Sequence, residues 1–146
     1  MRVTRYTDYS LRVLIFVALK GKQQSTIAEI AKSYNISKNH LMKVVQALNN
    51  NGYLIAVRGK NGGLYLNGQP EDINIGTLVR ETEQDLPLVE CFSDQNECII
   101  TPACELKKVF SEALEGFFQV LDQYTLADLV NKKRRAALSR LLKIID

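Results

Sequence analysis

Apolar residues recur at helical spacing along most of the chain, and only two short runs have the spacing of strands. The segment from Tyr9 to Leu19 is apolar on most of its faces and predicts a largely buried helix. Thr7 is its expected N-cap, and Gly21 follows its expected end. The chain therefore begins with a predicted core helix.

Two shorter helices follow and predict a helix-turn-helix. Thr26 and Glu29 have the spacing of a capping box, which opens a short helix. Asn35 stands where the tight turn needs a left-handed residue, and Ser37 caps a third helix that ends before Gly52. The expected inward positions are Ile30, Ala31, Tyr34, Ile36, Leu41 and Val44. The alternative for this segment is a plain helical hairpin with a solvated outer face.

Residues 53–57 and 64–66 are the two strand-like runs, and they predict a β-hairpin. Its tip, residues 58–63, combines two cations with three glycines. Glycines allow the tip to approach a phosphate backbone or a minor groove, where the cations bind. No helix with Lys-Ser/Thr follows these glycines, so the tip does not match a phosphate-binding loop of a nucleotide enzyme. A helix-turn-helix followed by such a hairpin predicts a winged helix.

The charge distribution supports nucleic-acid binding by this first half. Residues 1–66 carry a net charge of +8 and residues 67–146 a net charge of −5, which leaves +3 for the whole chain. Polar and basic groups at the start of the third helix suit base edges and phosphates in a major groove. The predicted DNA-binding residues are Ser37, Lys38, Asn39, His40 and Lys43 on this helix and Arg58, Lys60 and Asn61 on the wing.

The second half begins with a short amphipathic helix at 75–83 and then loses its periodicity. Residues 84–100 carry acids, one proline and two cysteines, so they predict a loop. Thr101 is the expected cap of a new helix, with Pro102 at its first position and Cys104 in its first turn.

The apolar stripe of this late helix is long and wide. It consists of Leu106, Phe110, Ala113, Phe117 and Val120, flanked by Val109, Leu114, Phe118 and Leu121. Such a stripe favours pairing with a second copy of the chain, although packing onto the same chain's core satisfies the periodicity equally well. Residues 124–130 add a helical turn, and the basic run 132–135 begins a tail predicted to be helical through Leu142, with a solvated face.

Three cysteines, Cys91, Cys98 and Cys104, are the only ones in the chain. An odd number does not suit a disulfide framework, whereas three thiolates with one further ligand form a common soft-metal site. The spacing lacks the close pairs of zinc fingers, and wide spacing in an irregular loop favours a bulky polynuclear iron–sulfur cluster. The alternative is that the cysteines are small buried apolar residues.

A cluster held by three cysteines needs a fourth ligand. His40, the single histidine, lies on the predicted reading helix and is therefore a poor candidate. A carboxylate is possible, and because it binds iron more weakly than a thiolate it would leave one iron labile and open to small molecules. The candidates are Glu90, Asp94, Glu97 and Glu105 near the loop, and Asp8 if a dimer brings the first helix of one chain over the loop of the other.

The whole composition is that of a cytoplasmic protein without a membrane span. The chain has 146 residues, no apolar run long enough to cross a bilayer, and a start that lacks the features of a signal peptide. One histidine and no nucleotide fingerprint leave little for acid–base catalysis, so we expect no enzyme. An iron–sulfur or redox-responsive regulator of another signal, or a thiol protein, are the alternative functions.

Taken in order, these motifs resemble a family of bacterial winged-helix regulators that carry iron–sulfur clusters, most closely its nitric-oxide-sensing repressor branch. The matching segments are Thr7-Asp8-Tyr9 with Leu11-Arg12, Ser37 to Leu41, Val57 to Gly63, Ile99 to Cys104, and Tyr124 to Leu129. The sister branch that regulates cluster assembly has a histidine three residues after the last cysteine. Lys107 stands at that position here, which argues against the sister function.

The resemblance implies a homodimeric repressor that binds double-stranded operator DNA with its [2Fe-2S] or [4Fe-4S] cluster intact and releases it on nitrosylation. It implies that Cys91, Cys98 and Cys104 are cluster ligands and that Asp8 of the partner chain is the fourth. The predicted fold is mainly helical with a small β-hairpin. We expect a winged helix-turn-helix at 1–83, a cluster-binding loop at 84–101, and a long C-terminal dimerisation helix with the tail at 102–146.

Overall fold

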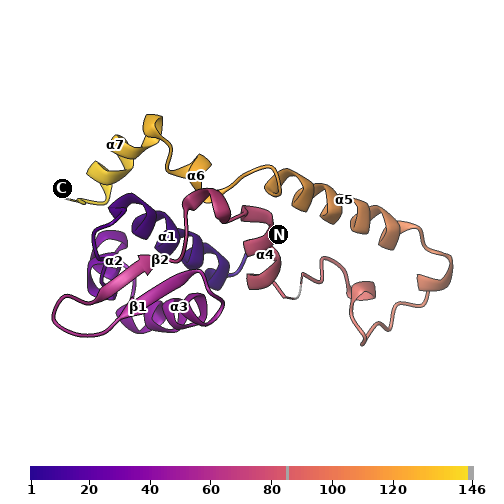
Figure 1. The fold of residues 1–146 in the computed structure, drawn as a ribbon. Coiled ribbons are helices and arrows are strands. Elements are labelled where there is room, and N and C mark those ends of the chain that lie inside the picture. The colour runs from indigo at the N-terminus through magenta and orange to yellow at the C-terminus, as the bar shows by residue number, and fades with distance from the viewer. Residues whose placement is uncertain (85, 145–146) are drawn as a thin grey trace.

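The computed structural model describes residues 1–84 and 86–144, so residue 85 of the predicted loop and residues 145–146 of the predicted tail lie outside the described residues. The elements are α1 (Arg5–Lys20), α2 (Ile27–Tyr34), α3 (Lys38–Asn50), β1 (Leu54–Val57), β2 (Gly63–Leu66), η1 (Pro70–Asp72), α4 (Ile75–Thr82), η2 (Glu90–Phe92), η3 (Thr101–Ala103), α5 (Leu106–Leu121), α6 (Leu126–Leu129) and α7 (Lys132–Leu141). Here η marks a turn of 3-10 helix. The mainly helical fold with one hairpin is confirmed (Figure 1). Among the described residues, no helix is both long and apolar enough to cross a membrane.

The helix-turn-helix forms as its capping residues predict. Thr26 and Glu29 make both bonds of the capping box, Asn35 has a φ of 56° and a ψ of 51°, and the Ser37 side chain caps α3. The hairpin is antiparallel, with Leu54 opposite Leu66. The wing is pinned to the helices because Ser25, just before α2, pairs with Leu64 through two backbone hydrogen bonds of 3.1 and 2.7 Å.

Two predicted helix starts are wrong. The cap of α1 is Thr4, whose hydroxyl accepts a hydrogen bond from the Thr7 backbone N–H, while Thr7 itself lies inside the helix and is fully buried. Thr101 does not open the long helix either. It begins the single turn η3, Cys104 then adopts an extended conformation, and α5 starts only at Leu106. The Thr101 hydroxyl donates a hydrogen bond of 2.8 Å to the Cys98 carbonyl.

The core joins the winged helix to the end of the chain. Leu14 of α1, Leu41 of α3 and Leu126 of α6 are all fully buried in one cluster. Ser33 of α2 donates a hydrogen bond of 2.8 Å to the Leu142 carbonyl. By contrast, α5 has no buried residue within the described chain. It extends away from this body, and the segment with the cysteines lies at its outer end (Figure 1).

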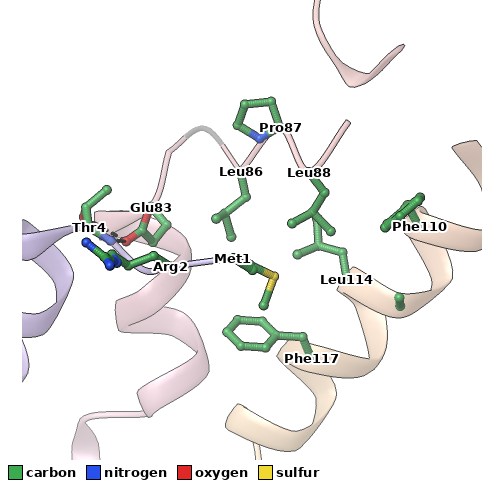
Figure 2. Close-up of a pocket in the computed structure, with 11 residues that line it drawn as sticks. Met1, Arg2, Thr4, Glu83, Leu86, Pro87, Leu88, Phe110, Leu114 and Phe117 are labelled. Carbon is green, nitrogen blue, oxygen red and sulfur yellow. Dashed lines mark hydrogen bonds between the residues drawn. The ribbon is translucent and has the colours of Figure 1, made fainter. Parts of the chain in front are cut away.

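A buried carboxylate ties the start of α1 to the end of α4. Glu83 is only 6% exposed, and one of its oxygens accepts hydrogen bonds from the Thr4 N–H (2.5 Å), the Thr4 hydroxyl (2.8 Å) and the Thr7 hydroxyl (2.6 Å). Figure 2 shows Thr4 and Glu83 facing each other at this junction. Burial alone would raise the pKa of Glu83, but these hydrogen bonds outweigh it and lower the pKa below its ordinary 4.5.

We predict that Glu83→Gln lowers the free energy of unfolding by about 1–3 kcal/mol at neutral pH, because the charged acceptor is lost. A carboxylate whose folded pKa is depressed stabilises above its unfolded pKa and loses that contribution as pH falls through the folded value. The gap between Glu83→Gln and the parent should therefore close as pH falls below 4.5. Urea unfolding across this range measures it.

Glu71→Gln is the matched control, since the Glu71 side chain is exposed on η1. Its unfolding free energy should follow the parent at every pH. A gap for Glu83→Gln that stays constant as the pH is lowered would contradict the assigned role of the carboxylate charge.

Candidate metal centre and nucleic-acid interface

Short local hydrogen bonds shape the segment that carries the three cysteines. Cys91 lies in the turn η2. The backbone N–H of Cys98 is held by the Asn96 side chain at 3.0 Å, and the Asn96 amide also donates to the Thr101 hydroxyl at 2.9 Å. Cys104 follows η3 directly. These bonds give an otherwise irregular segment a defined path that turns all three cysteines toward the same place.

All three cysteines line a single cavity of about 150 Å³. Its other lining residues are Val89, Glu90, Ile100, Thr101, Leu106 and Lys107. The thiols are free; Cys98 is exposed, and the other two are half-buried. The cavity brings three thiols together with one acidic and one basic residue, and its wall is otherwise largely apolar.

Cys104 lies at the positive end of α5 even though it is outside the helix. Its Sγ accepts a hydrogen bond of 3.4 Å from the backbone N–H of Leu106. Helix N-termini stabilise thiolates, and thiolates are the form that binds metals. The prediction that Cys104 occupies the first turn is wrong, but the electrostatic argument attached to it still applies.

Three thiols around one space are the ligand type that iron–sulfur clusters use. Among residues 1–84 and 86–144, no three His, Cys, Asp or Glu side chains come close enough to form a ready-made ion site. The three cysteines nevertheless share a cavity. Widely set thiolates around a common space are what an iron–sulfur cluster requires, because the cluster itself spans the distance between ligands.

The candidates for the fourth ligand are separated by the structure. Glu90 lines the cysteine cavity, whereas Asp94, Glu97 and Glu105 are not among its lining residues. Asp8 is not among them either, since it lies on α1 and forms an ion pair of 2.7 Å with Arg12. Within one chain, therefore, Glu90 is the acid beside the thiols, and Asp8 could reach them only from a second chain.

The predicted DNA-binding residues form two exposed groups. Ser37, Lys38, Asn39, His40 and Lys43 are exposed at the start of α3, and Arg58, Lys60 and Asn61 are exposed at the tip of the hairpin. The tip depends on its glycines: Gly59 has a φ of 106°, and a Cβ on Gly62 would lie 2.1 Å from the Val57 carbonyl oxygen. Both groups belong to one rigid winged helix, so they can engage a duplex together.

One set of contacts was missed by the sequence reasoning. Arg12 lies over the ring of Tyr9, 5.4 Å from its centroid, and the Tyr9 ring meets the His40 ring edge-on at 5.6 Å. Burial raises the pKa of Tyr34, whose hydroxyl donates to the Arg12 carbonyl, to about 12. The spacing of Asp8 and Arg12 on one helix face was the available signal. Asp8 is thus connected through α1 side chains to the start of α3.

Comparison with known proteins gives a consistent result. Residues 3–132 match the Rrf2 family, described as iron-dependent transcriptional regulators. The HTH-type transcriptional regulator NsrR of Bacillus subtilis (strain 168) is 52% identical over 146 residues, which is 99% of both chains. NsrR of Geobacillus kaustophilus (strain HTA426) is 50% identical over 145 residues, covering 98% of this chain and 97% of the relative.

Solved structures share the fold. CymR, the global cysteine regulator of B. subtilis, is 28% identical with a TM-score of 0.67, covering 88% of this chain and 95% of that one. IscR of T. potens has a TM-score of 0.73 at 23% identity, covering 93% of this chain and 90% of that one, and this likeness concerns the fold alone.

Proposed function

The chain belongs to the Rrf2 family of iron-dependent transcriptional regulators, and we propose that it is a homodimeric repressor whose iron–sulfur cluster senses nitric oxide. Membership confirms the resemblance that the sequence motifs suggested, and it makes the protein a DNA-binding regulator and not an enzyme. The cluster, the dimer, the effector and a cytoplasmic location are the parts that we add.

One observation carries the proposal: the three cysteines of this iron-dependent regulator line the same cavity. Inert buried cysteines would have no reason to converge on a common space. The thiols of Cys91, Cys98 and Cys104 are the proposed ligands, and the Leu106 N–H stabilises the thiolate of Cys104. The cluster would supply iron that reacts with nitric oxide.

The fourth proposed ligand is Asp8 of the partner chain. Its side chain is 42% exposed on α1, so a second molecule can approach it, and its present partner Arg12 is itself 39% exposed. A carboxylate is a weaker ligand for iron than a thiolate, which leaves that iron accessible to a small molecule. Glu90 is the alternative within the same chain, because it lines the cavity.

We assign DNA binding to the start of α3 and to the wing, and dimer formation to α5. None of the apolar residues of α5 is buried within the described chain, and Leu106, Val109 and Val120 are each more than half exposed. Burial against a second α5 would remove this apolar surface from water. The proposed division into a winged helix (1–83), a cluster loop (84–101) and a dimerisation part (102–146) follows from these roles.

The link between the two sites runs along α1. Asp8 contacts Arg12, Arg12 contacts Tyr9, and Tyr9 contacts His40 at the start of α3. When Asp8 changes its partner, Arg12 loses its carboxylate and the packing under His40 changes. Coupling between two sites requires such an element with two arrangements.

The proposal predicts that nitric oxide, added without oxygen, bleaches the visible absorbance and weakens operator binding by at least about tenfold in parallel. The probe is a duplex that the protein itself selects from random sequences. Absorbance and fluorescence anisotropy, recorded on the same titration, measure both. Bleaching without any loss of DNA affinity would refute the sensing function, and it would leave a regulator of another signal.

Asp8→Ala is expected to change the visible spectrum and to speed bleaching, because one ligand is lost, while Glu90→Ala leaves both unchanged. Anaerobic absorbance and stopped-flow mixing with nitric oxide measure these effects. The reverse pattern would place the fourth ligand within the same chain, at Glu90, and would exclude Asp8.

Lys38→Ala and Arg58→Ala should each weaken operator binding and reduce the slope of log affinity against log salt by about 1, because each removes one phosphate contact. The cluster spectrum should not change. Arg140→Ala is the control, since this exposed cation lies on α7, away from α3. A salt slope in Lys38→Ala or Arg58→Ala equal to that of the parent would remove that residue from the DNA interface.

A further inference from the structure

We propose that Arg80, Asp122 and Gly76 form a joint that fixes the angle between α5 and the winged helix, and that this angle sets the separation of the two reading helices. The inference rests on the proposed function in one respect, that two copies pair through α5. Arg80 and Gly76 belong to α4, and Asp122 ends α5. None of these residues belongs to the cysteine cavity or to the DNA-binding groups.

The ion pair at the joint has a directional geometry. Arg80 donates from Nη1 to Asp122 Oδ1 at 2.5 Å and from Nη2 to Oδ2 at 2.9 Å. Its guanidinium also lies over the Phe118 ring, 4.6 Å from the centroid. A two-point fork stacked on a ring restrains orientation as well as distance. The hydrogen bonds from Arg80 lower the pKa of Asp122, so the pair is charged at neutral pH.

Gly76 allows α5 to end directly against α4. A Cβ at this position would lie 1.8 Å from Asp122 Oδ1 and 2.9 Å from its backbone nitrogen, so any other residue would force the two helices apart. Two further hydrogen bonds join the start of α4 to the residues that follow α5. The Asn74 side chain donates to the Asp122 carbonyl at 2.8 Å, and the Ile75 N–H donates to the Tyr124 carbonyl at 2.9 Å.

The rest of α5 is not held against the body in the same way. A cavity of about 580 Å³ separates Phe110, Leu114 and Phe117 of α5 from Met1 and from the segment that follows α4. Figure 2 shows Leu114 and Phe117 of α5 pointing toward Leu88 and Met1. These α5 side chains are only half-buried, and the directional contacts of α5 with α4 are those at its C-terminal end.

The length of α5 amplifies any change at the joint. Its 16 residues span roughly 24 Å, so a rotation of about 10° at one end moves the other end by roughly 4 Å. That displacement is comparable to one base-pair step of DNA, about 3.4 Å. In a dimer paired through α5, the same rotation changes the spacing of the two winged helices by a similar distance.

The Arg80–Asp122 pair is too exposed to add much to the free energy of unfolding. The Arg80 and Asp122 side chains are 46% and 39% exposed, and exposed ion pairs contribute little to folding stability. A directional pair with little effect on stability is suited to setting an orientation. Its loss should therefore alter the geometry of the dimer more than the unfolding temperature.

The test measures how strictly the dimer requires its half-site spacing. Holo-protein binds the selected operator and two derivatives with one base pair inserted or removed between the half-sites. The parent should bind both derivatives at least about tenfold more weakly, because each shift also rotates one half-site. In Asp122→Ala and Gly76→Ala this discrimination should fall to about threefold or less, with the visible spectrum unchanged.

Further variants test whether Arg80 and Asp122 act through the same interaction. Arg80→Ala should relax the discrimination as much as Asp122→Ala, and the double variant should relax it no further. Glu71→Ala, which removes an exposed carboxylate of η1, should discriminate as the parent does. If Gly76→Ala does not fold, Asp122→Ala still decides.

Two outcomes would overturn the inference: a parent that binds all three duplexes equally, or an Asp122→Ala protein that discriminates as sharply as the parent. Neither outcome depends on nitric oxide, so failure of the sensing function and failure of the joint are told apart. If the parent protein does not respond to nitric oxide but still requires the selected half-site spacing, only the sensing function is refuted.

Discussion

The stretch of chain that contains the cysteine segment and α5 is attached to the winged helix at both of its ends. At the end of α4, Glu83 accepts three hydrogen bonds from Thr4 and Thr7. At the end of α5, Arg80 holds Asp122. An anchor at Glu83, just before the irregular segment, reduces the number of conformations open to its start.

We propose that the metal site is coupled to the DNA-binding surface through side chains of α1. Thr7 is adjacent to Asp8 in sequence. Asp8 pairs with Arg12, Arg12 lies over the Tyr9 ring, and Tyr9 contacts His40 at the start of α3. In our proposal, Asp8 has two competing partners, the Arg12 guanidinium of its own chain and the cluster of the other chain. A ligand can shift an equilibrium only by binding its states unequally, and this competition provides such an inequality.

The sequence predicts local structure well where side chains bond to their own backbone. The capping box of Thr26, the left-handed Asn35 and the glycine-rich wing are all confirmed, because each depends on residues close in sequence. Contacts between residues distant in sequence were missed. The hydroxyl of Thr4 donates to Glu83, and Thr4, not Thr7, is the N-cap of α1. The fourth ligand also stays a prediction, since it depends on a second chain.

The central claim is that sulfur-bound iron held by three thiols maintains the DNA-binding form. The most direct test prepares the protein without oxygen, measures its iron and acid-labile sulfide, and compares operator affinity before and after a chelator removes the iron. We predict iron together with sulfide, and affinity at least about tenfold lower after removal. Iron-free protein that binds the operator as tightly as the untreated sample would contradict the account.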